Sequence, residues 1–96
     1  MRRELLAELR LNPRYDHGHF NLGLLYYALG RRAEALRLWD KTLELNPDYT
    51  DAYAQILVHY YNARDAEKIA AYWNTARARG LILPPQLTEA LLQSLR

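Results

Sequence analysis

The near-copies LRLNPRY (residues 9–15) and LELNPDY (residues 43–49) decide how this chain is organised. They lie 34 residues apart, and five of their seven positions are identical. The same offset aligns Trp39 with Trp73 and brings two Tyr-Tyr dipeptides into register. A fixed period of this length is typical of stacked structural repeats, so the chain is read first as a repeat.

Apolar residues recur at helical spacing along the whole sequence, and no stretch alternates as a strand does. Six helices are predicted, at about residues 3–11, 17–29, 32–45 and 51–63, from just after Asp65 to about residue 79, and from Pro84 onward. Two Asn-Pro dipeptides end helices, because a residue before proline avoids the helical conformation. Asp16, Thr50 and Asp65 are the expected N-caps, and Gly30 is the expected left-handed residue after the second helix.

Each repeat is therefore predicted to be a pair of helices. One such pair cannot bury its apolar face alone, and stacking neighbouring pairs buries a continuous core. The expected fold class is all-α, with no disulfides because the chain has no cysteine.

Residues 16–49 resemble the tetratricopeptide repeat. They carry Leu22-Gly23, Tyr26, Gly30, Ala35, Trp39 and Pro47 at the spacing of that family. The resemblance implies antiparallel helical hairpins stacked as a short right-handed solenoid of about six helices. It also implies that Gly23 and Ala35 face each other where the two helices cross, with aromatic side chains filling the space beside them. We expect Trp39 and Trp73 both to be largely buried, each between its own hairpin and the next helix.

The other parts of the chain follow the same pattern less closely. Residues 50–83 form a degenerate repeat, in which Leu57, Ile69 and Arg64 stand where the first copy has Gly23, Ala35 and Gly30. Residues 1–15 resemble the second helix of a partial repeat, and residues 84–96 a C-terminal helix or cap. We expect residues 1–96 to form one domain of this kind.

The resemblance implies a protein–protein interaction module that binds a peptide or helix of a partner on the concave face lined by the first helix of each hairpin. By phase, the partner-binding positions are His17, Phe20, Leu24, Tyr27, Asp51, Ala54, Val58, Tyr61 and Asn62. An apolar or aromatic partner segment suits such a face. An equally open reading is that the C-terminal helix folds back and covers it with Leu87, Leu91 and Leu95.

Several other functions are disfavoured by the sequence. Phe20 and Leu24 stand where some family members clamp a terminal carboxylate, and neither can bind one. His17 and His19 are two residues apart and do not share a helical face, so no metal site is expected. No catalytic motif, phosphate loop or cofactor site is present, and we predict no enzyme activity.

The chain has a low net charge. The net charge is +2 with both signs interspersed, so nucleic acid is disfavoured as a partner, and no apolar run is long enough for a membrane span. The absence of cysteine is compatible with the cytoplasm, but the compartment stays open. Two functional alternatives also stay open: a structural or regulatory segment of a larger protein, including an enzyme, and self-association through uncovered apolar ends.

Overall fold

The computed structural model describes residues 15–94, and this part of the chain contains five α-helices and no strand. In chain order the helices are α2 (Asp16–Ala28), α3 (Arg32–Leu45), α4 (Thr50–Asn62), α5 (Ala66–Ala78) and α6 (Pro85–Ser94). The all-α class is confirmed for these residues, and the order of the elements is that of a short helical solenoid. The helix predicted at residues 3–11 lies outside the described residues.

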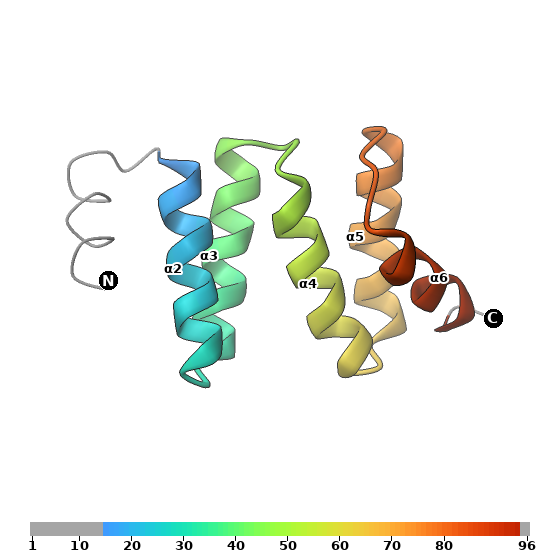
Figure 1. Cartoon of the computed structure of the whole chain (residues 1–96), viewed down its shortest axis with the longest axis horizontal. Coiled ribbons are helices and arrows are strands. Elements are labelled where there is room, and N and C mark those ends of the chain that lie inside the picture. The colour runs from blue at the N-terminus through green and yellow to red at the C-terminus, as the bar shows by residue number, and fades with distance from the viewer. Residues whose placement is uncertain (1–14, 95–96) are drawn as a thin grey trace. The chain divides into compact units, whose positions relative to one another are not determined.

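The chain divides after Tyr49 into two compact units. In the first unit α2 and α3 form an antiparallel hairpin, and in the second α4 and α5 do the same (Figure 1). Helix α6 follows α5 and packs against α4. The predicted bounds of α3 are confirmed to the residue, and those of α2, α4 and α5 to within one residue at each end.

The helix starts correct two of the three predicted caps. Asp16 is the first residue of α2 rather than its cap; the cap position is Tyr15, which makes no side-chain capping bond. Thr50 likewise lies inside α4 as its first residue. Asp65 is confirmed, because its carboxylate accepts a hydrogen bond of 3.1 Å from the Lys68 amide and so satisfies a free N–H of α5.

The C-terminal ends of α2 and α4 have the same capping geometry. After α2, the Arg31 amide donates to the Tyr26 carbonyl at 2.9 Å, and Gly30 between them has a left-handed φ of 84°. This is the Schellman arrangement, which satisfies carbonyls that the helix leaves open. After α4, the Asp65 amide donates to the Tyr60 carbonyl at 3.0 Å, and the left-handed residue is Arg64, with φ 57°.

The core of the first unit is built around Trp39, which is 1% exposed. A Cβ at Gly23 would lie 2.5 Å from the indole Nε1, so only glycine allows the ring to lie this close to α2. The indole N–H donates to the Phe20 carbonyl at 3.2 Å, which satisfies the buried polar atom. Gly23 is thus in contact with Trp39, and Ala35 is completely buried in the same hairpin.

The second unit fills its core with larger residues. Leu57 and Ile69, at the positions of Gly23 and Ala35, are 0% and 1% exposed, and Trp73 is 5% exposed. The prediction that both tryptophans are buried is confirmed. The contact between α4 and α5 is less extensive than that between α2 and α3, as expected when larger side chains separate two helices.

Candidate functional site

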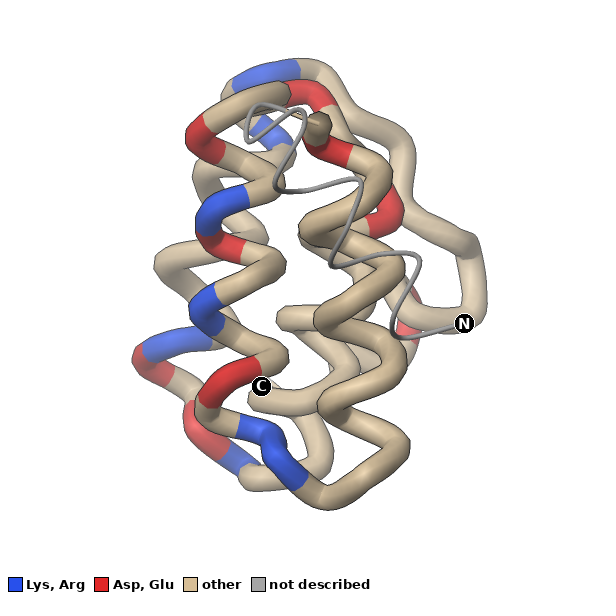
Figure 2. The backbone as a smooth tube through the Cα atoms, turned by 90° about the vertical axis from the view of Figure 1, so that its left-hand side faces the viewer, with Lys and Arg blue, Asp and Glu red and all other residues tan. Residues whose placement is uncertain are grey.

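The two members of each hairpin differ in charge. Helices α2 and α4, the first members, each carry one acidic residue near their start, Asp16 and Asp51, and no lysine or arginine. Helix α3 carries six charged residues, and the two signs follow each other along it, while α2 is almost free of charge (Figure 2). The first helices therefore carry few charges, and charged residues are depleted at the centre of protein–protein interfaces.

The predicted positions on α2 fall into two groups. Leu24 is 38% exposed and His17 is also exposed. Phe20 is only 7% exposed, and its ring lies 5.0 Å from that of Tyr49. Tyr27 is half-buried and stacks on the Trp39 indole at 5.4 Å. Phe20 and Tyr27 therefore contribute to the packing of the hairpin.

The start of α2 is hydrogen-bonded to the segment that follows α3. The Nδ1 atom of His17 and the Tyr49 hydroxyl are 2.7 Å apart, and the Asn46 amide donates to the Asp16 carboxylate at 3.1 Å. Partial burial alone would raise the pKa of Asp16, but the hydrogen bonds from Asn46 and from the His17 amide outweigh it and lower that pKa. The network stabilises the ionised carboxylate and holds the two ends of the hairpin together.

The predicted positions on α4 are mostly open. Val58 is 41% and Tyr61 is 38% exposed, and Asp51 and Asn62 are exposed as well, whereas Ala54 is half-buried. Helix α6 packs on this same helix, with Leu91 completely buried and Leu87 half-buried. Leu95 lies outside the described residues. The C-terminal helix thus packs on α4, while Val58 and Tyr61 keep substantial exposed area.

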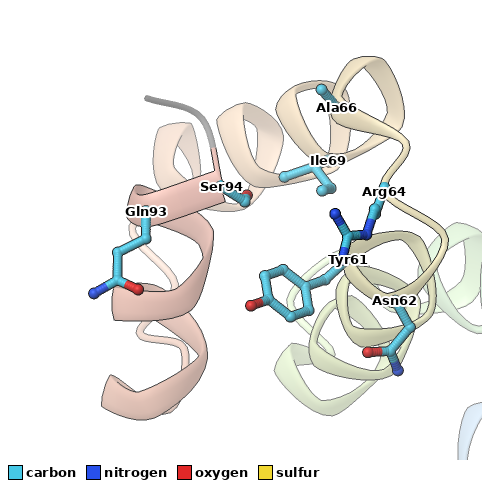
Figure 3. A pocket seen from close by; sticks show the side chains of 7 residues that line it. All are labelled: Tyr61, Asn62, Arg64, Ala66, Ile69, Gln93 and Ser94. Atoms are coloured by element: carbon cyan, nitrogen blue, oxygen red, sulfur yellow. The ribbon is translucent and has the colours of Figure 1, made fainter.

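A pocket of about 460 Å³ lies in the second unit beside the end of α4. Its lining consists of Tyr61, Asn62, Arg64, Ala66, Ile69, Gln93 and Ser94. Figure 3 shows the Tyr61 ring directed into the space between α4 and α6, with the Arg64 guanidinium on the side toward Ile69. Two of these residues, Tyr61 and Asn62, belong to the predicted site, and the other five were not predicted.

The sequence held one signal for this pocket. Arg64 stands 34 residues after Gly30, at a position where the first repeat has the residue that a left-handed turn favours. A large charged residue at such a position is unusual. Gln93 and Ser94 could not be found in this way, because they approach α4 only through the packing of α6.

Arg31 and Arg32, at the start of α3, lie over aromatic rings of their own unit. The Arg31 guanidinium is 4.8 Å from the centre of the Tyr26 ring and pairs with Glu34 at 2.7 Å. Arg32 lies over Tyr27 at 5.3 Å. Such contacts stabilise the cation on the ring face and give these residues a structural role.

Neither a metal centre nor a membrane span is found in the described residues. Among residues 15–94, no three His, Asp or Glu side chains gather to hold an ion. No helix in this part of the chain has both the length and the apolar character that crossing a bilayer requires.

Antiparallel helical hairpins, whose first helices carry no lysine or arginine, define a helical-repeat protein of the kind that serves as a binding scaffold. Residues 17–49 of the chain match the family model of the tetratricopeptide repeat, and this stretch is such a repeat. No curated protein matches the chain. Tetratricopeptide repeats generally act as protein–protein interaction modules and typically have no enzyme activity of their own.

Proposed function

We propose that this chain binds a peptide or helix of a partner protein through the faces of its first helices, which carry no lysine or arginine, in the groove expected of the repeat. The observation that carries the proposal is the exposure of large apolar side chains there, with Leu24 at 38%, Val58 at 41% and Tyr61 at 38%. Apolar side chains that stay exposed on helix faces without lysine or arginine favour the burial of a partner's apolar residues.

The packing of α6 on α4 bears on the alternative reading. A helix that covered the whole face of α4 would bury Val58 and Tyr61, and both remain exposed with α6 in place. Helix α6 therefore leaves room for an additional partner on the second unit. The first unit offers Leu24 and His17 independently of α6.

The test begins with a selection of phage-displayed random peptides of about 15 residues, long enough to form a short helix or an extended segment. Enriched peptides are then synthesised, and their dissociation constants are measured by fluorescence anisotropy. Leu24→Glu and Val58→Glu place a charge on α2 and on α4, at residues that are exposed. Each should weaken binding about tenfold or more, which is about 1.4 kcal/mol.

The matched control is Asn74→Glu, which adds the same charge at an exposed position of α5, a second helix. It should leave the dissociation constant unchanged. Tyr27→Ala is a poorer probe, because the Tyr27 ring also packs on Trp39. Equal binding by the parent, Leu24→Glu and Val58→Glu would refute the proposal, as would failure of the selection to enrich any peptide.

A further inference from the structure

Arg64 occupies a backbone position that an arginine adopts only at an energetic cost. Within residues 15–94 three residues have a left-handed φ, and the other two are Gly30 and Gly80. All three follow the end of a helix and play the same part in the hydrogen bonding of the turn. A side chain is unfavourable in this conformation because Cβ approaches the following carbonyl oxygen. The turn after α4 therefore offers no structural reason for an arginine.

The Arg64 side chain is not explained by a partner in the fold either. Ion pairs join Arg31 to Glu34 and Lys41 to Glu44, and Arg64 takes part in neither. Its guanidinium instead lines the 460 Å³ pocket, next to Tyr61 and Ile69 (Figure 3). Strained residues that persist without a structural role are candidates for a functional one.

The residues that line the pocket around Arg64 carry one charge, and it is positive. None of its lining residues is acidic, and Arg64 is the charged one. Helix α5 begins at Ala66 on the pocket wall, so the positive end of the helix dipole lies beside it. The neighbouring Asp65 carboxylate is outside the lining and is engaged by the Lys68 amide.

The rest of the lining suits a short side chain with an apolar stem. Ile69 and Ala66 provide apolar wall, while the Tyr61 hydroxyl provides a hydrogen-bond donor. The Ser94 hydroxyl is already used, since it donates to the Leu91 carbonyl at 3.0 Å. A planar carboxylate matches the two parallel N–H donors of a guanidinium in geometry as well as in charge.

We propose that this pocket binds the side-chain carboxylate of a glutamate or aspartate in a partner polypeptide, paired with the Arg64 guanidinium. The proposal rests on the proposed function, since it names one residue type in the partner. It places the acid at the turn between α4 and α5 of the second unit, whereas Phe20 and Leu24 belong to α2 of the first unit.

The probe is Nα-acetyl-glutamate N-methylamide, whose side-chain carboxylate is its one charge. It is titrated into the ¹⁵N-labelled chain and followed by two-dimensional NMR. We expect shifts of the Arg64 Nε–H signal and of the Ser94 amide signal, with a dissociation constant of about 1–10 mM, as suits so small a ligand. The neutral glutamine analogue should produce no such shifts.

The decisive variant is Arg64→Gly, which removes the cation and places at this turn the residue that the turns after α2 and α5 already use. It should fold at least as stably as the parent and bind the glutamate probe at least tenfold more weakly. Arg64→Lys keeps the charge but not the paired donors, and should lie between the two.

Four results would overturn the proposal. These are unchanged probe binding by Arg64→Gly, equal binding of the glutamine analogue, preferential binding of Nα-acetyl-alanine, whose carboxylate is a chain terminus, and preferential binding of inorganic phosphate. Failure of this proposal is distinguishable from failure of the proposed function. If selected peptides bind Arg64→Gly as tightly as the parent, carboxylate binding in the pocket is refuted, and peptide binding by the first helices is not. A chain that binds the glutamate probe but selects no peptide would refute the groove alone.

Discussion

Replacing Gly23 by alanine adds one methyl group to α2 at the point where the Trp39 indole lies against the helix. The new Cβ would be 2.5 Å from Nε1 and 2.7 Å from Cδ1 of that ring. Both distances are well inside van der Waals contact. The ring is 1% exposed, so it has no solvent space into which it can turn.

Two effects of opposite sign decide the outcome. In an open helix interior, Gly→Ala stabilises by about 1 kcal/mol. Overpacking a filled core costs about 1–3 kcal/mol. Moving the indole to relieve the overlap would lengthen its 3.2 Å hydrogen bond to the Phe20 carbonyl, and such a bond contributes about 0.5–1.5 kcal/mol. It would also disturb the stacking on Tyr27. We therefore predict that Gly23→Ala lowers the free energy of unfolding by about 2 kcal/mol net.

The assay is urea denaturation followed by far-ultraviolet circular dichroism. Asn21→Ala is the control for helix propensity, because Asn21 is exposed on the same helix and should give a small gain of up to about 0.7 kcal/mol. Repeating Gly23→Ala in a Trp39→Phe background measures the coupling between the two residues, and the smaller ring should reduce the penalty. If Gly23→Ala is as stable as the parent, the close approach of ring and helix does not constrain this position, and the reasoning fails.

The remaining predictions concern the core, the N-cap of α5, the hydrogen bonds of Asp16 and the exposed Leu92 of α6. Trp39→Ala should lower the free energy of unfolding by about 3–5 kcal/mol, and a midpoint of urea denaturation that hardly moves would contradict its burial. Asp65→Ala should cost about 0.5–2 kcal/mol by the same assay, while Asp65→Asn should cost much less because asparagine also caps helices. The pKa of Asp16 is lowered from 3.8, so its contribution is present above that pH and is lost as the pH falls through the folded-state pKa. The difference in the free energy of unfolding between the parent and Asn46→Ala should accordingly shrink as the pH falls from about 7 to about 2. A difference independent of pH would show that the Asp16 carboxylate does not contribute to it. Leu92, 51% exposed on α6, should contribute to weak self-association, so sedimentation at rising concentration should show a larger mass for the parent than for Leu92→Glu; a strictly monomeric parent would rule this out.

The candidate site could be predicted only in part from the sequence. Helical phase identified Leu24, Val58 and Tyr61, which are exposed, because the side of a helix that a residue occupies follows from its spacing alone. Phase also grouped Phe20 and Tyr27 with them. It could not show that these two rings pack on Tyr49 and Trp39, since those partners are many residues away in the chain.

What the sequence determined by itself is the repeat and the limits of its helices. Asn46-Pro47 and Gly30 are local signals for the ends of α3 and α2, and each acts through the backbone of the residues that carry it. Trp39 and Trp73 were identified as core residues because a large aromatic recurring in phase has to fill the same place in each repeat.

Only the tertiary structure decided the rest. Asp16 bonds to Asn46 instead of capping α2, since the fold brings a donor from the end of α3 within reach of its carboxylate. The pocket beside Tyr61 exists because α6 returns to α4 and completes it with Gln93 and Ser94. Hydrogen bonds and pockets of this kind depend on distances between residues that are remote in sequence, and no local pattern encodes those distances.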